Sequence, residues 1–153
     1  MEPDIAKIAN VIRPFTGLCG LGKDIDVKFL AAGLFNKVYI VSSTDKDSKG
    51  TKECIFRCAL PDFPWYRTQI EVSTMEYVRH NTTIPVPKIY AFDSSMDNEL
   101  GLEWILMEKV QGTTYADAQS KMTFEAKVEL HKTVADWVDQ LSRIQFDTMG
   151  SLY

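Results

Sequence analysis

The order of the apolar segments constrains the fold of this chain more than any other feature of its sequence. Five short, β-prone apolar segments precede residue 111, and a segment of helical character lies between the third and the fourth. The predicted strands are residues 27–32, 37–43, 54–60, 88–92 and 103–110, and the predicted helix is residues 65–80. This order predicts an α+β fold in which a five-stranded antiparallel sheet carries one helix inserted after its third strand.

Helices are also predicted before and after the sheet. Residues 4–13 carry apolar side chains at helical spacing and are followed by a glycine-rich connection at 16–24. After Gly112 the pattern becomes helical, and Thr123 to Ile144 predicts a long amphipathic helix. Its predicted apolar face consists of Val128, His131, Ala135, Val138 and Leu141. The chain therefore divides into an N-terminal helix and connection (1–26), a sheet region (27–110) and a helical region (111–153).

Composition excludes several classes of protein. The net charge of -4 and the scattered basic residues argue against a nucleic-acid partner, which would need a basic surface. No apolar run approaches the roughly 20 residues that span a membrane, and the N-terminus predicts neither a secretory signal nor a transit peptide. The three cysteines form no disulfide framework, which favours a reducing compartment and the cytosol. Cys54 and Cys58 are interpreted as buried apolar residues rather than metal ligands.

The turn between the first two strands contains a possible phosphate-binding loop. The stretch from Leu30 to Val38 resembles the glycine-rich hairpin with which kinases cover the phosphates of ATP. Only the middle glycine, Gly33, is kept, and Ala31 and Asn36 stand in place of the other two. Phe35 lies within the same turn. A plain β-hairpin is the alternative interpretation.

The third strand offers a cation for phosphate. Kinases place a lysine at the position that Arg57 occupies here, and a guanidinium binds phosphate through two parallel hydrogen bonds. Strand alternation puts Ile55 on the same face, where it would contact adenine. A solvent-exposed strand face is the alternative for this arginine.

The inserted helix offers a carboxylate partner for Arg57. Glu71 lies close to Met75 and Val78 on a helical projection, whereas Glu76 falls off the edge of this apolar stripe. A carboxylate within a buried stripe requires a cation, because an unpaired buried charge is costly. Glu71 is therefore the predicted partner, with a surface carboxylate as the alternative.

The fifth strand leads into a short connector that has a counterpart in kinases. There the connector is the hinge, whose backbone groups bind the adenine edge. By position Met107 would be the gatekeeper, and the Glu108 carbonyl and the Val110 amide would contact adenine.

Several stretches of the chain together resemble fungal members of the aminoglycoside phosphotransferase-like superfamily, which is protein-kinase-like and includes proteins named for altered inheritance of mitochondria. These stretches are Phe35–Val38, Glu71–Met75, Ile84–Lys88, Trp104–Glu108, Gly112 and Gly150–Tyr153. The resemblance implies a kinase-like N-lobe at 27–110, followed by the hinge exit and the first helices of a truncated C-lobe. It also implies binding of ATP with Mg²⁺, transfer of phosphate to an alcohol group of a small molecule, and a possible mitochondrial location.

The catalytic residues of that superfamily are not found in these 153 residues. Its members use a His/Asp motif with a following Asn and then a metal-binding Asp, whereas His80 precedes Asn-Thr-Thr and His131 lies within a predicted helix. Two hypotheses follow. The chain is either the nucleotide-binding part of a phosphotransferase, or a non-catalytic remnant that binds a protein partner or itself through its exposed C-lobe helix.

Overall fold

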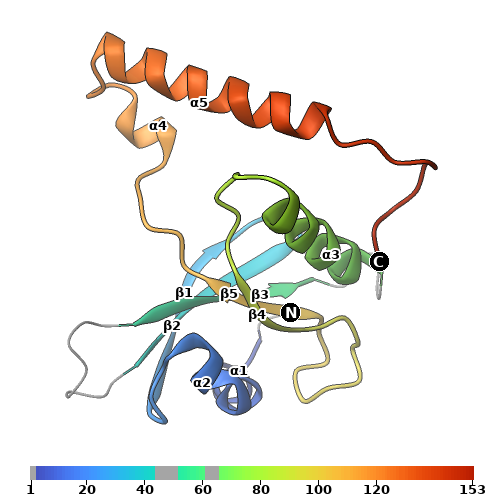
Figure 1. Ribbon diagram of the computed structural model, residues 1–153. Coiled ribbons are helices and arrows are strands. Elements are labelled where there is room, and N and C mark those ends of the chain that lie inside the picture. Colours follow the sequence, from blue (N-terminus) through green and yellow to red (C-terminus); the bar gives the residue numbers. More distant parts are fainter. Residues whose placement is uncertain (1–2, 44–51, 61–65) are drawn as a thin grey trace.

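The computed structural model describes residues 3–43, 52–60 and 66–153, and its architecture is α+β (Figure 1). In the described residues five strands form one antiparallel sheet in the order β1-β2-β3-β5-β4. The strands are β1 (Ile25–Ala32), β2 (Asn36–Ser43), β3 (Glu53–Ala59), β4 (Ile89–Asp93) and β5 (Trp104–Glu108). The predicted fold class is confirmed, and each predicted strand is present with ends that differ by a few residues.

The helix inserted after β3 is present as α3 (Tyr66–Asn81). The segment before the sheet forms α1 (Ile5–Ile12), a short 3-10 helix (Arg13–Phe15) and α2 (Thr16–Cys19). The predicted connection at 16–24 was therefore wrong in its first half, because four residues there close one more helical turn. The helix ends at Gly20, whose φ of 66° lies in the left-handed region that favours glycine.

The core lies between the sheet and the N-terminal helices. Alternation along β3 buries Cys54, Phe56 and Cys58 on this face of the sheet. Ile8 and Ile12 of α1 are fully buried against the same cluster, and Figure 1 shows α1 and α2 on the side of the sheet opposite α3. The apolar residues at helical spacing in 4–13 therefore cover this face of the sheet.

The other face of the sheet is covered by α3. Val72 packs against Ile105 and Met107, and Ile55 and Met75 contact this smaller cluster. Because Ile55 belongs to this face, strand alternation places Arg57 on it as well. The second face thus carries the residues predicted to bind a nucleotide.

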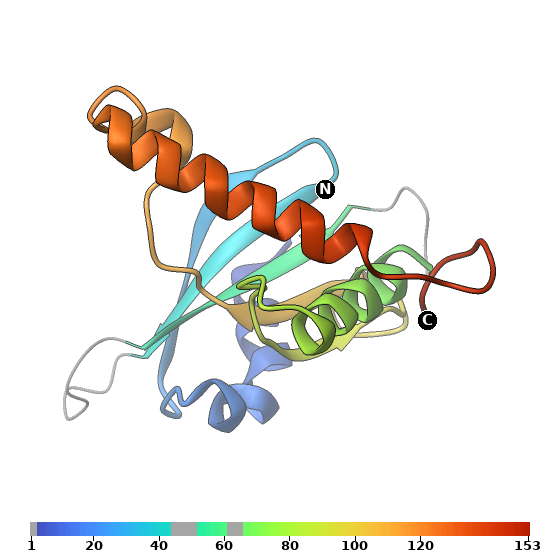
Figure 2. The same ribbon diagram turned by 45° about the horizontal axis from the view of Figure 1, so that its top comes forward.

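The chain after β5 leaves the sheet and forms α4 (Tyr115–Ala118) and α5 (Phe124–Ser142). The long helix was predicted and the short one was not. Figures 1 and 2 show α5 crossing over α3 and held away from the sheet by the connector that follows β5. None of the residues of α5, all of which the structure describes, is buried. Within the described residues, no helix is both long enough and apolar enough to cross a bilayer.

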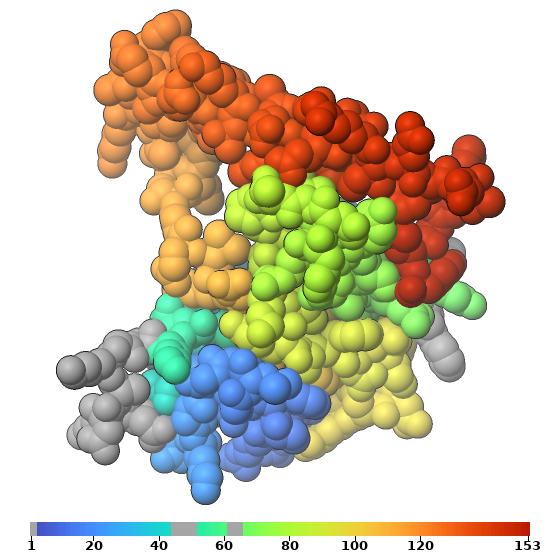
Figure 3. Space-filling model, viewed as in Figure 1, coloured from blue at the N-terminus to red at the C-terminus, as the bar shows by residue number. Residues whose placement is uncertain are grey.

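The apolar face predicted for α5 is largely open to solvent. Val138 and Leu141 are exposed, as is His131, whereas Val128 is half-buried. Side chains of α5 reach the rest of the molecule near its C-terminal end, where the Thr83 amide donates a hydrogen bond of 2.8 Å to the Gln140 Oε1 atom. Near this end the helix therefore rests on the segment that follows α3, as the space-filling view in Figure 3 also shows.

Candidate functional site

The candidate site is the face of the sheet that carries Arg57. The strand register places Arg57 of β3 between Val38 of β2 and Ile105 of β5. One row along the sheet, Ile55 lies between Ile40 and Met107. The structure therefore brings the predicted site residues Val38, Ile55, Arg57 and Met107 together on neighbouring strands, and their binding of a nucleotide stays a prediction.

Arg57 pairs with Glu71 across the gap between β3 and α3. The guanidinium Nη2 atom lies 2.5 Å from the Glu71 Oε2 atom, and the side chains are 19% and 34% exposed. The predicted choice of partner is confirmed, because Glu76 instead lies 3.5 Å from the Nδ1 atom of His80 one helical turn later. The pair fixes the guanidinium while leaving part of its surface open to a ligand.

The β1–β2 hairpin stands beside this pair. Its turn is closed by a 2.8 Å hydrogen bond from the Gly33 amide to the Asn36 carbonyl. A Cβ atom added at Gly33 would approach only the Asn36 carbonyl oxygen, at 3.9 Å, and Gly33 is not among the glycines with positive φ. The turn itself therefore does not require glycine at this position, which leaves close approach of a ligand as a reason for it. Leu30 is exposed and lies where the β1 register shifts, between Phe29 and Ala31.

The tip of the hairpin is attached to the beginning of α3 by a contact that sequence reasoning missed. The Arg67 guanidinium lies over the Phe35 ring, 5.1 Å from its centroid, and the Leu60 amide donates a 2.8 Å hydrogen bond to the Phe35 carbonyl. A cation over an aromatic face is attractive. The available signal in the sequence was Arg67 at the second position of α3, but its partner, Phe35, is distant in sequence.

The connector residues are only partly gathered at the site. Met107 is buried on the α3 face, while Val110 is exposed on the chain that leaves the sheet. The Glu108 amide donates a 2.8 Å hydrogen bond to the Lys88 carbonyl, and its carboxylate accepts one of 3.1 Å from the Lys88 amide. These bonds anchor the end of β5 to the segment before β4, and the roles predicted for the Glu108 carbonyl and the Val110 amide stay predictions.

A buried carboxylate, also missed by sequence reasoning, positions α3. Glu103 is 4% exposed and its Oε2 atom accepts a hydrogen bond of 3.3 Å from the Thr68 amide in the first turn of the helix. A carboxylate is stabilised there by the unpaired amides and the positive end of the helix dipole. Since Glu71 lies one turn further, this contact helps to set the position of the partner of Arg57. The signal was an acidic residue at the start of an apolar strand.

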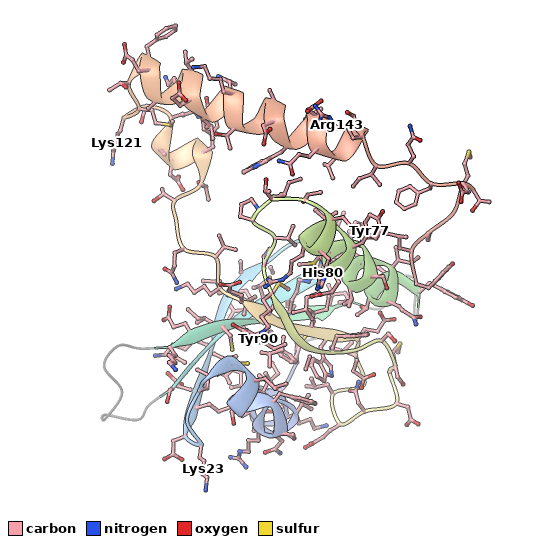
Figure 4. The ribbon with its side chains drawn as sticks, in the orientation of Figure 1. Lys23, Tyr77, His80, Tyr90, Lys121 and Arg143 are labelled. Carbon is pink, nitrogen blue, oxygen red and sulfur yellow. The ribbon has the colours of Figure 1, made fainter. Side chains whose placement is uncertain are left out.

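Two hollows lie on other parts of the surface. One of about 1050 Å³ is lined by Tyr77 and Val78 of α3 and by Ile144 and Phe146 of the C-terminal segment, and Figure 4 shows Tyr77 on that side of α3. Another of about 420 Å³ lies between α3 and β4. In the described part of the chain, no group of three or more His, Cys, Asp or Glu residues is arranged to hold a metal ion.

Comparisons with known proteins place the chain beside fungal proteins of two names. It is 32% identical over 130 residues to a subtelomeric hrmA-associated cluster protein of Aspergillus fumigatus, a match that covers 84% of this chain and 25% of that protein. It is 27% identical over 165 residues to altered inheritance of mitochondria protein 9, mitochondrial, of Yarrowia lipolytica, covering 97% of this chain and 28% of that one. The Candida tropicalis protein of that name is 28% identical over 89 residues, or 54% of this chain and 14% of the relative.

These relatives are much longer than the chain, which spans about a quarter of the length of the Aspergillus fumigatus proteins. No family model matches the sequence. The similarity to fungal altered-inheritance-of-mitochondria proteins that was noted in the sequence is thus confirmed.

Proposed function

We propose that these residues are the nucleotide-binding N-terminal part of an ATP-dependent small-molecule phosphotransferase of the aminoglycoside phosphotransferase-like type. The observation that carries the proposal is the Arg57–Glu71 pair, which joins the middle of the sheet to the helix inserted after β3. Kinases hold their phosphate-binding cation through a corresponding carboxylate on the corresponding helix. An arginine fits this task because its guanidinium can bind the carboxylate and still present further N–H donors to a phosphate.

The arrangement of the site fits the parts of ATP. Val38, Ile55 and Met107 offer an apolar strip for adenine. We propose that the Glu108 carbonyl and the Val110 amide would bind the adenine edge. Arg57 and the hairpin turn at 33–36 would hold the phosphates. In such enzymes Mg²⁺ neutralises charge on the phosphates, and its ligands and the catalytic base would come from other residues of a longer protein of this kind.

Direct titration of a nucleotide tests the proposal. The whole chain is titrated with a fluorescent ATP analogue, with and without Mg²⁺, and competed with ATP. We expect saturable binding that Arg57→Ala weakens by about tenfold, which corresponds to the loss of a charge-assisted hydrogen bond. Arg143→Ala is the matched control, because Arg143 pairs with Asp139 at the exposed end of α5 (Figure 4). Equal binding by both variants, or no saturable binding, would refute the proposal.

A second function has one observation in its favour. Helix α5 exposes Val134, Val138 and Leu141 to solvent. An apolar face of this kind supports a role as a protein-interaction module, either with a partner or with a second copy of this chain. Measurement of the molar mass in solution separates the two cases, since only the second makes the mass depend on the concentration of the pure chain.

The location in the cell is also a proposal. Composition predicts the cytosol, whereas the names of several relatives include the word mitochondrial. We propose the mitochondrion on the strength of these relatives. Fractionation of fungal cells that carry the tagged endogenous gene would place the protein with a matrix marker or with a cytosolic one.

A further inference from the structure

The end of helix α2 lies directly against the beginning of strand β3. At Gly20 the chain turns out of the helix, and a Cβ atom added there would lie 2.8 Å from the Lys52 Nζ atom. The Gly22 amide, two residues on, donates a hydrogen bond of 3.3 Å to the Ser43 hydroxyl at the end of β2. The turn after α2 is therefore fixed to the end of the sheet at which β2 finishes and β3 begins.

This contact brings two cysteines together. Cys19 is the last residue of α2 and packs against the core cluster that contains Cys54, which is 1% exposed. Both side chains thus meet in one cluster on this face of the sheet, and the Cys19 Sγ atom lies 3.6 Å from the Phe15 carbonyl oxygen. Cys19 is only half-buried, so one thiol of the pair is accessible from solvent and the other is not.

The two thiols differ in acidity. The hydrogen bond that Cys54 donates stabilises a thiolate at Cys19 and lowers the pKa of Cys19, against the opposing effect of burial. The same hydrogen bond, together with burial, raises the pKa of Cys54. At Cys58 burial raises the pKa to about 12. An accessible thiolate beside a second thiol is the arrangement in which oxidation is selective.

We propose that Cys19 and Cys54 are a redox-sensitive pair, which a hydroperoxide converts into a disulfide that fastens α2 to β3. The Cys19 thiolate attacks the peroxide oxygen, the O–O bond breaks, and Cys19 becomes a sulfenic acid while the leaving oxygen departs as water or an alcohol. The Cys54 sulfur then attacks the Cys19 sulfur, and hydroxide leaves with the Cys54 proton as a second water. Two thiols are thus oxidised by two electrons, and one hydroperoxide is reduced.

The disulfide would lie on the face of the sheet opposite the candidate nucleotide site. Cys54 alternates with Ile55 along β3, so its side chain points to the α1 and α2 side and not toward Arg57. The proposal is therefore independent of phosphotransferase function. It changes how firmly the N-terminal helices are held to the sheet.

Peptide mapping tests the pairing, because trypsin places each cysteine on a different peptide. The peptides are residues 8–23 with Cys19, 53–57 with Cys54 and 58–67 with Cys58, since the Arg13–Pro14 bond resists cleavage. The reduced protein is treated with hydrogen peroxide, quenched with catalase, blocked with N-ethylmaleimide and digested without reductant. We expect a cross-link between 8–23 and 53–57 within one chain, with 58–67 carrying the blocking group.

Variants and a stability measurement complete the test. Cys58→Ala should keep the cross-link and Cys19→Ala should abolish it; Cys19 is chosen because Cys54 is buried in the core. Peroxide should raise the melting temperature of the wild type by about 5–10 °C, reversibly with dithiothreitol, and leave that of Cys19→Ala unchanged. A stable Cys19 sulfenic acid trapped by dimedone without a cross-link, a link that includes 58–67, or links only between chains would overturn the proposal.

Discussion

The Glu103 carboxylate accepts a hydrogen bond from the Thr68 amide, and this contact connects the residue before β5 to the first turn of α3. The two residues are 35 positions apart in the chain. The bond lies in the interior, where replacement of one partner leaves the other without its hydrogen bond. The position of α3, and therefore of Glu71, depends on it.

We expect Glu103→Ala to lower the free energy of unfolding by about 1–3 kcal/mol, because an amide of the first helical turn then lacks its acceptor. Urea unfolding followed by circular dichroism measures the change. Glu103→Gln keeps an acceptor oxygen and should lose less. Glu99→Ala is the control, since Glu99 accepts its hydrogen bond from Asn10 at the exposed surface, and a loss as large as that of Glu103→Ala would contradict the assignment.

The Arg57–Glu71 pair should show a coupling free energy of about 1 kcal/mol in a double-mutant cycle with Arg57→Met and Glu71→Gln. The value lies between those of surface pairs and buried pairs, because both side chains are only partly covered. Unfolding of the wild type, the two single variants and the double variant gives the coupling. The exposed Lys132–Glu129 pair, measured in a cycle with Lys132→Met and Glu129→Gln, should give a smaller coupling free energy.

Gly33→Ala should leave stability unchanged or raise it by up to about 1 kcal/mol, because the added methyl group meets no close atom. The same substitution should weaken binding of the ATP analogue several-fold if the hairpin approaches the phosphates. Gly20→Ala is the contrasting variant, and should cost about 1–2 kcal/mol because Gly20 has a φ of 66°. A Gly33→Ala protein that binds like the wild type would separate the hairpin from the nucleotide site.

The exposed face of α5 should make the pure chain self-associate. Full burial of a Val or Leu side chain is worth roughly 1.5–3 kcal/mol. Val134, Val138 and Leu141 are only partly covered, so each would gain part of this free energy on association. Light scattering coupled to size exclusion should show a mass that rises with concentration, and Val138→Lys with Leu141→Lys should reduce it. Leu18→Lys, at an exposed apolar residue of α2, should not. A monomer at every concentration would contradict this expectation.

The 153-residue chain should transfer no phosphate when it is incubated with ATP, Mg²⁺ and a panel of alcohols. The reason is that its sequence holds no His/Asp motif followed by Asn and a metal-binding Asp. Release of ADP, measured by a coupled assay against a heat-killed sample, checks this. Turnover above that background would show that other residues of the chain perform the chemistry.

Local patterns were sufficient to predict much of the fold. The strands and α3 follow from apolar periodicity within each segment, and the Arg57–Glu71 pair follows from strand alternation combined with the helical position of Glu71. Both arguments use neighbours only a few residues apart, plus the simple rule that a buried carboxylate requires a cation.

The features that were missed are contacts between distant segments. The Glu103 bond to Thr68, the stacking of Arg67 on Phe35 and the meeting of Cys19 with Cys54 each join elements whose relative position depends on the packing of the whole sheet. The short helices α2 and α4 were not predicted for a different reason, because four residues are too few to show the helical repeat of apolar side chains.

The support of α5 at its two ends has a mechanical consequence. At its N-terminal end α5 is joined to the sheet by the connector after β5. Near its C-terminal end, Gln140 is hydrogen-bonded to Thr83, and the centroid of the Phe146 ring lies 5.4 Å from that of the Tyr77 ring. Exposed hydrogen bonds of this kind contribute about 0.5–1.5 kcal/mol each, which is comparable to the thermal energy. The distance between α5 and the sheet is therefore set in part by weak contacts, and hydrogen exchange at the Thr83 amide measures how readily these contacts open.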